Sequence, residues 1–169
     1  MASESPFAHL PDGARLWTFG TSRLLAPDEE ARLLAATDRF LEGWKAHGHP
    51  LAAAREWRLG RFLLVAVDDR ITPPSGCSID ALVRTLGAME RELGVELVGG
   101  APLWLRRVPG EGPDAVERVS RDEFRRRAAE GEIDGDTLVF DLTLTRVGEL
   151  RAGEWERRAA DGWHAWLLP

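Results

Sequence analysis

An apolar run in the first half of the chain, RFLLVAVD at residues 61–68, constrains the fold more than any other feature of the sequence. A strand that is apolar throughout is buried on both faces, which places it in the middle of a sheet. The preceding run, LAAAREWRL at residues 51–59, also has the character of a strand, and Gly60 alone separates the two. The sequence therefore predicts a tight hairpin whose second strand is central.

Two amphipathic helices are predicted, one on each side of this hairpin. Residues 27–48 open with a proline and three acidic residues, which suit a helix N-terminus. Apolar residues then recur at three- and four-residue spacing, and Gly48 is a natural end, with His47 in the last turn. Residues 79–93 carry a second stripe of the same spacing, which predicts a helix that begins close to Cys77.

Strand-like runs at residues 15–20 and 101–108 complete the order strand, helix, strand, strand, helix, strand. This order is the split βαβ pattern, so we expect an α+β protein with a ferredoxin-like βαββαβ core over residues 14–109. Such a core has an antiparallel sheet with two helices on one face.

Residues 110–169 are expected to extend the core within a single domain, 1–169. They contain a loop rich in proline and glycine, a short arginine-rich helix, a strand at residues 136–147 and a tail. Tryptophans of the tail are expected to anchor it by packing, or to line a binding surface: Trp155, Trp163 and Trp166.

The composition argues against several functions. A formal net charge of −6 disfavours binding to nucleic acid. The chain has no apolar run long enough to cross a membrane and no signal-peptide core, so a cytoplasmic protein is expected. One cysteine excludes an intrachain disulfide and a cysteine-rich metal site. The sole lysine, Lys45, does not lie in a phosphate-binding G-x-x-x-x-G-K-[ST] loop, and no cofactor is predicted.

The single cysteine lies at a corner, PPSGCSID at residues 73–80, where the second helix begins. A thiol at a helix N-terminus is favoured as the thiolate by the helix dipole, and Asp80 one turn away opposes this effect. Gly76 permits the close approach of a ligand or of another backbone. Cys77 is therefore either a reactive thiol or a small residue at a helix cap.

A catalytic arrangement would need a base for Cys77. His164 lies in DGWHAW, and Asp161 precedes it by three residues. Cys77, His164 and Asp161 would then serve as nucleophile, base and orienting carboxylate.

Two alternatives use the same histidines. His47, His49 and His164 could supply three zinc ligands, but their spacing matches no recognised metal motif, so no metal site is predicted. By analogy of fold alone, a dimeric α+β barrel could hold haem through His164 or His47.

Three motifs resemble those of a family of small bacterial proteins often labelled "ABC transporter ATPase". They are W-x-x-H-G at Trp44 to Gly48, GCSID at Gly76 to Asp80, and D-x-W-H at Asp161 to His164. The family label implies nucleotide hydrolysis. Because the phosphate-binding loop and its lysine are missing, we do not expect an ABC-type ATPase.

The leading expectation is a binding module for an unknown small molecule or protein, with a surface that joins Cys77, His47 and His164. Further residues are assigned to that surface: Gly48, Gly76, Ser78, Asp80 and Trp163. The alternative is a cysteine-dependent enzyme that transfers or hydrolyses acyl or thiol groups. No nucleic acid or membrane partner is expected, and a homodimer is possible.

Overall fold

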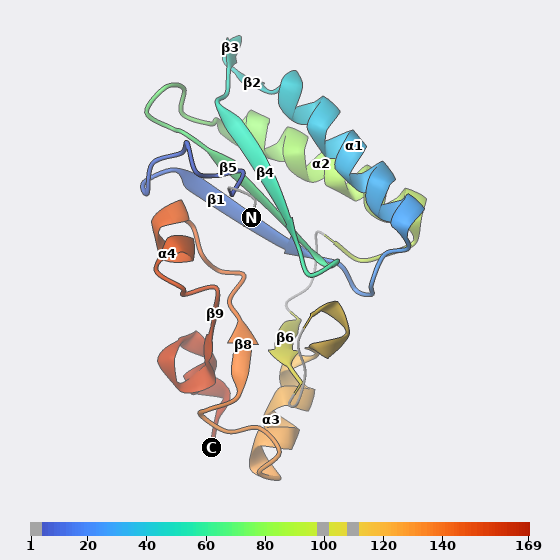
Figure 1. The fold of residues 1–169 in the computed structure, drawn as a ribbon, viewed down its shortest axis with the longest axis vertical. Coiled ribbons are helices and arrows are strands. Elements are labelled where there is room, and N and C mark those ends of the chain that lie inside the picture. The colour runs from blue at the N-terminus through green and yellow to red at the C-terminus, as the bar shows by residue number, and fades with distance from the viewer. Residues whose placement is uncertain (1–4, 98–101, 108–111) are drawn as a thin grey trace.

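A computed structural model describes residues 5–97, 102–107 and 112–169 of the chain. It shows an α+β protein with antiparallel sheets, as predicted. Figure 1 shows a helix-bearing part at one end of the longest axis and the C-terminal half of the chain at the other end. In the described ranges, no helix is both long and apolar enough to cross a membrane.

The first sheet has three strands in the order β1-β5-β4, with every neighbouring pair antiparallel. The strands are β1 (Arg15–Gly20), β4 (Ala53–Arg58) and β5 (Phe62–Val67). Every residue of β5 is buried, so the prediction of a central strand is confirmed. Alternate residues of β5 enter two different cores, one on each face of the sheet.

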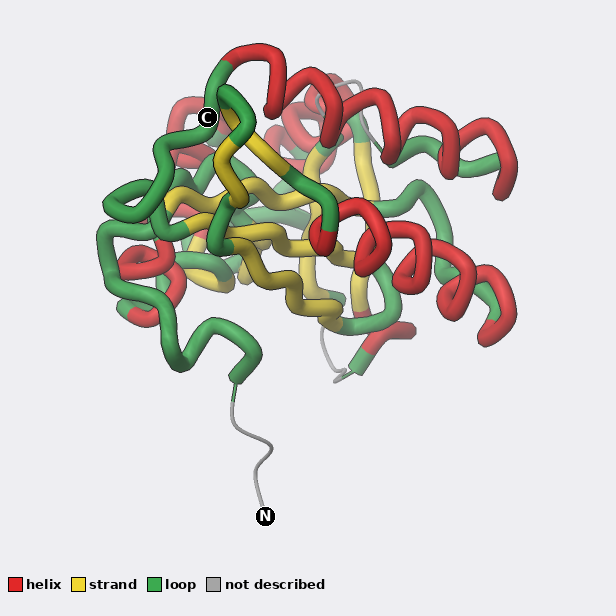
Figure 2. Tube along the Cα trace, turned by 90° about the horizontal axis from the view of Figure 1, so that it is seen from above, coloured by secondary structure: helices red, strands yellow, loops and turns green. Residues whose placement is uncertain are grey.

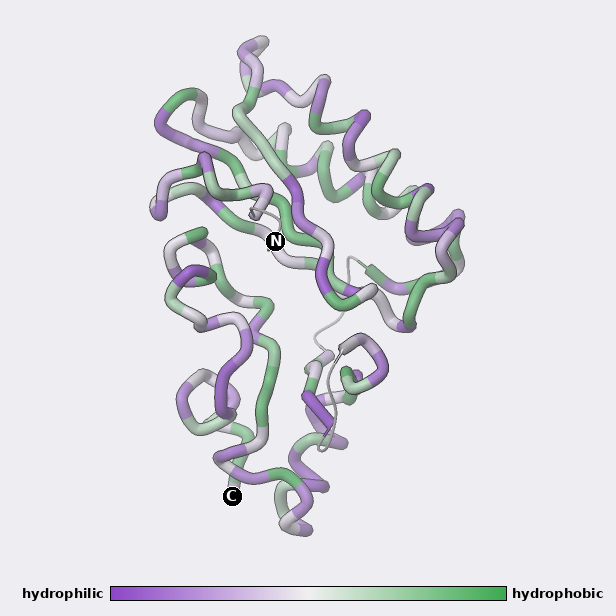
Figure 3. Tube along the Cα trace, viewed as in Figure 1, coloured by the Kyte–Doolittle hydropathy of each residue, from purple (hydrophilic) through white to green (hydrophobic). Residues whose placement is uncertain are grey.

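Two long helices, α1 (Pro27–Glu42) and α2 (Gly76–Leu93), lie side by side and cover one face of this sheet (Figure 2). Along both helices hydrophobic stretches recur between hydrophilic ones, which is the pattern of amphipathic helices (Figure 3). Ser75 caps α2, because its hydroxyl accepts a 3.1 Å hydrogen bond from the Ser78 N–H. Gly94 ends α2 in the left-handed region, at φ 63°.

The first helix is shorter than predicted. It ends at Glu42, and the following residues form a small antiparallel hairpin of β2 (Lys45–Ala46) and β3 (His49–Pro50). His47 and Gly48, at φ 51° and 80°, make the turn of this hairpin rather than the end of a helix. The prediction that the helix ends at Gly48 was therefore wrong, because a glycine in the left-handed region suits a hairpin turn as well as a helix end.

The complete ferredoxin-like arrangement is not confirmed, because the strand order differs. The strand predicted at residues 101–108 does not join the first sheet. It is β6 (Leu103–Arg106) of a second sheet, in the order β7-β6-β8-β9, whose other strands are β7 (Val116–Val119), β8 (Leu138–Phe140) and β9 (Glu156–Arg158). Trp104 packs into one core and Leu103 and Leu105 into another, so β6 is buried on both faces, as a central strand is.

The position that β6 would have taken beside β1 is filled by a later segment. The Leu16 N–H donates to the Thr145 carbonyl at 2.8 Å, and the Val147 N–H donates to the Ala14 carbonyl at 3.0 Å. The first half of the outer edge of β1 is therefore closed from within the chain.

The described residues of the C-terminal half also form two α-helices and three 3₁₀ segments: α3 (Arg121–Ala129), α4 (Val147–Arg151), η1 (Pro113–Ala115), η2 (Ala159–Asp161) and η3 (Trp163–Leu167). The long strand predicted at residues 136–147 is limited to β8, because Asp141 and Thr143 form a turn. An aromatic cluster joins the two sheets: Phe62 lies 5.2–5.7 Å, between ring centroids, from Phe140, Trp155 and Trp104.

Candidate functional site

The predicted site residues fall into two groups, and the first lies at the start of α2. Cys77 and Asp80 are exposed, whereas Ser78 is buried and completes the cap of the helix. The indole N–H of Trp44 donates to the Ser78 carbonyl at 2.8 Å, which holds the β2–β3 hairpin beside this corner. His47 and Gly48, at the tip of the hairpin, thus lie at the same end of the molecule as Gly76 and Cys77.

The second group lies in the C-terminal segment. His164 is fully buried and stacks on Trp163 with ring centroids 4.2 Å apart, and within the described residues neither ring nitrogen has a hydrogen-bond partner. Burial lowers the pKa of His164 to about 4; the Asp141 carboxylate opposes this shift, and Arg157 and Arg121 add to it. The imidazole is therefore neutral in the folded protein at neutral pH.

Asp161 does not orient His164. Its two carboxylate oxygens accept hydrogen bonds from Arg158 at 2.8 and 2.9 Å, and these bonds lower the pKa of Asp161. The first turn of α2 and the C-terminal segment lie at opposite ends of the molecule (Figure 1). The structure therefore does not bring Cys77, His164 and Asp161 together.

The proposed zinc ligands are likewise separated, since His47 and His49 are exposed on the hairpin and His164 is buried elsewhere. Within the part of the chain that the structure describes, no three His, Cys, Asp or Glu residues are grouped to hold a metal ion.

The C-terminal group instead fastens the tail. The buried carboxylate of Asp141 accepts hydrogen bonds from the Thr143 hydroxyl at 2.6 Å, from the Trp163 indole at 3.2 Å and from Arg157. Burial raises the pKa of Asp141, but the hydrogen bonds from Thr143 and Arg157 outweigh burial and the net shift is downward. Trp155 is also buried, whereas Trp166 is 88% exposed, so only part of the expected tryptophan anchoring is present.

The sequence did not reveal a different feature, the outer edge of β4. The Asp68 N–H donates to the Ala52 carbonyl at 2.9 Å, which makes residues 52 and 68 a hydrogen-bonded pair of the antiparallel ladder. Because such pairs alternate with non-bonded ones, Ala54 and Glu56 point their backbone groups toward β5. The backbone N–H and C=O groups of Ala53 and Arg55 therefore point outward, away from the sheet.

The two outer edges of the first sheet differ. The edge of β1 is paired with the segment from Thr145 to Val147, whereas the edge of β4 is paired with no described strand. Across the described residues, no hydrogen bond reaches the outward backbone groups of Ala53 or Arg55. Unpaired strand edges of this kind are templates for pairing with another chain.

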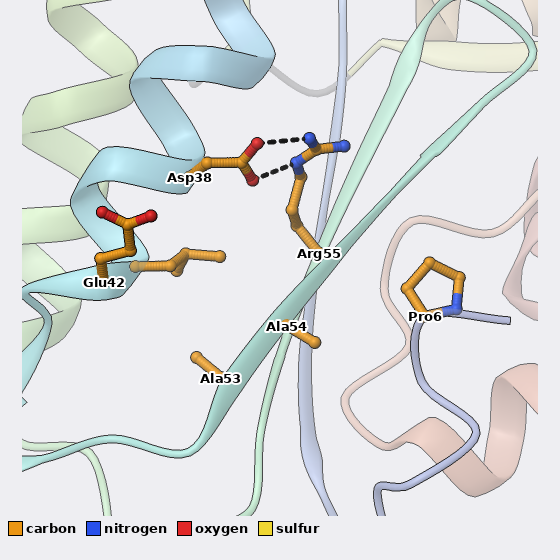
Figure 4. A pocket seen from close by; sticks show the side chains of 7 residues that line it. Pro6, Asp38, Glu42, Ala53, Ala54 and Arg55 are labelled. Atoms are coloured by element: carbon orange, nitrogen blue, oxygen red, sulfur yellow. Dashed lines mark hydrogen bonds and ion pairs between the residues drawn. The ribbon is translucent and has the colours of Figure 1, made fainter.

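A groove of about 470 Å³ lies along this edge (Figure 4). Its lining residues come from the N-terminal segment, the end of α1 and the first half of β4: Pro6, Asp38, Leu41, Glu42, Ala53, Ala54 and Arg55. Ala53 packs with the core on the helix side of the sheet and Ala54 with the core on the other side. The groove therefore straddles the edge of the strand, and two small side chains leave the backbone accessible. We call it the β4 groove.

Of the two carboxylates in the β4 groove, one is in an ion pair among the described residues and the other is not. Arg55 donates to both carboxylate oxygens of Asp38 at 2.6 Å, which lowers the pKa of Asp38. Glu42 lies one turn further along α1, is exposed, and has no ion-pair partner among the described residues. Two carboxylates and one guanidinium leave the groove with a net negative charge.

No family model matches the chain, and neither the curated proteins nor the solved structures contain a match to it.

Proposed function

We propose that this protein is a peptide-binding module that accepts an extended segment of a partner protein along β4. One observation carries the proposal: Ala53 and Arg55 line the β4 groove, and their outward backbone groups have no hydrogen-bond partner in the part of the chain that the structure describes. An extended peptide added to a sheet edge obtains affinity from main-chain hydrogen bonds, and specificity from pockets for alternate side chains. The edge and the groove together supply both.

The energetics suit a selective, reversible contact. Two N–H and two C=O groups allow up to four main-chain hydrogen bonds, each with a net value of about 0.5–1.5 kcal/mol. Charged side chains on an edge strand discourage indiscriminate pairing. On β4 these charges are satisfied within the chain: Arg55 bonds Asp38, and Arg58 donates to Glu56 at 2.7 Å.

This proposal keeps the expected binding module in a cytoplasmic protein and moves its surface. His47 and Cys77 lie outside the groove lining, and His164 is buried in the other half of the molecule. The cysteine-dependent enzyme is supported less well, because no hydrogen bond links either nitrogen of His164 to another group of the described chain.

The test begins with random linear peptides displayed on phage and selected on the wild-type protein. Binding of a selected peptide is then measured by isothermal titration calorimetry with Ala53→Pro, which lacks the outward N–H and loses no bond to β5. The expected result is about a tenfold weaker affinity, which corresponds to one lost hydrogen bond of about 1.4 kcal/mol. Ala53→Ser keeps the N–H and should bind as the wild type does.

Two results would contradict the proposal. One is a selection that enriches no peptide on the wild type. The other is a selected peptide that binds Ala53→Pro and the wild type equally well.

A further inference from the structure

We infer that the peptide taken up by β4 is basic: it places a lysine or arginine side chain in the helix-side half of the β4 groove, against Glu42. This inference rests on the proposed function and names the class of its partner.

The direction of the side chains follows from β-sheet geometry. Residues directly opposite each other on neighbouring strands point to the same face. The Ala53 side chain packs on the helix side, so a peptide residue opposite it points toward α1 as well. Figure 4 shows Ala53 and Glu42 on the same side of the strand, with Pro6 on the other side. Since alanine fills little space, the opposing side chain can reach the last turn of α1.

The charges at that turn favour a cation. Asp38 accepts hydrogen bonds from Arg55 at both oxygens, whereas the Glu42 carboxylate has no ion-pair partner among the described residues. Leu41, partly buried against the core, offers an apolar wall for the methylene stem of lysine or arginine. An acidic peptide side chain would instead meet a like charge, which is destabilising.

The opposite face of the edge offers no comparable charge. Glu56 accepts hydrogen bonds from Arg58 at 2.7 Å and from the Ser5 hydroxyl at 3.2 Å. Pro6 and Ala54, which line that side of the groove, are uncharged. We therefore expect one basic position in the peptide, flanked by positions without a charge preference.

A charge exchange tests the inference. Peptides selected on the wild type should share one lysine or arginine position, and peptides selected on Glu42→Lys should carry glutamate or aspartate there. Replacing the basic residue by glutamine should weaken binding to the wild type by about two- to fivefold at low salt, as for an exposed ion pair. The difference should shrink as salt is added. Glu92→Lys, which makes the same charge change on an exposed residue in the last turn of α2, should leave selection and affinity unchanged.

Each possible result decides between the two proposals. Binding that Ala53→Pro weakens, but that shows no basic position and ignores Glu42→Lys, overturns the basic peptide and leaves strand addition intact. Binding that depends on Glu42 but not on Ala53→Pro overturns both. A protein that elutes as a dimer, and as a monomer after Ala53→Pro, shows that a second copy occupies the edge and also overturns the basic peptide.

Discussion

The buried environment of His164 argues against a role as a catalytic base. This histidine is fully buried, has no hydrogen-bond partner for either ring nitrogen among the described residues, and stacks on Trp163, while the tilted ring of Phe124 lies 6.5 Å away between centroids. A buried polar group without partners costs about 1–3 kcal/mol. The motif DGWHAW suggested a catalytic base. A histidine that is simply buried beside tryptophan has the same sequence pattern, so the motif does not distinguish the two roles.

Stability should therefore fall as the solution becomes more acidic. The pKa of His164 is about 4 in the folded protein and near 6.5 in the unfolded chain, so the unfolded state binds more protons between these values. We expect the free energy of unfolding to decrease as the pH is lowered from about 6.5 to 4, and Phe at this position to remove that part of the dependence. Urea denaturation of His164→Phe across this range provides the measurement.

The control is His49→Gln, an exposed hairpin residue, which should keep the wild-type dependence. The role of Asp141 is separable, because its folded pKa is lowered and its contribution is lost only at more acidic pH, below about 4. If His164→Phe retains the full decrease between pH 6.5 and 4, the histidine is not its source.

At the scale of elements, β4 is defined by the alternation of its hydrogen bonds. Ala53 and Ala54 are neighbours of the same type, but only Ala54 points its N–H toward β5. Proline is tolerated on an edge strand where the replaced N–H faces outward, and not where it removes a ladder bond.

The two proline variants should consequently differ in stability. Ala54→Pro leaves a buried acceptor on β5 unsatisfied and should lower the free energy of unfolding by about 1–3 kcal/mol. Ala53→Pro should lower it by less than Ala54→Pro does, because it removes no hydrogen bond of the ladder. Chemical denaturation of both variants measures the difference, and equal destabilisation would show that the assignment of outward groups is wrong.

Much of the helix-bearing half could be predicted because its signals are local. The apolar run of β5 and the stripe of α2 lead directly to a buried strand and a covering helix. The end of α1 could not be read, since Gly48 suits a hairpin turn as well as a helix end. The sheet to which β6 belongs depends on pairing with residues far along the chain, which periodicity does not record.

The site was harder to predict than the fold for a physical reason. The sequence interpretation relied on the reactivity of cysteine and histidine. The β4 groove contains neither: it is lined by small and apolar side chains, by the Asp38–Arg55 ion pair and by Glu42. Its only local signal is the small side chains of LAAAR before Glu56. A strand lies at an edge when no other strand pairs with its second side. This depends on how all strands of the sheet are arranged, which the local sequence does not record.

At the scale of the whole molecule, the aromatic cluster around Phe62 joins the two sheets. The closed edge of β1 faces the C-terminal half, through the segment from Thr145 to Val147, and the open edge of β4 lies on the other side of the first sheet. A peptide added to β4 would therefore extend the three-stranded sheet at the edge opposite the one that the C-terminal half covers.

The central claim is that the outward amides of Ala53 and Arg55 are free and become paired by a peptide. Hydrogen exchange of individual amides, followed by NMR, tests it most directly. We predict rapid exchange of both amides in the free protein, slow exchange of Ala54 and Glu56 throughout, and protection of Ala53 and Arg55 when a selected peptide saturates the protein. Amides of Ala53 and Arg55 that are already protected in the free protein, or that stay unprotected at saturation, would contradict the account.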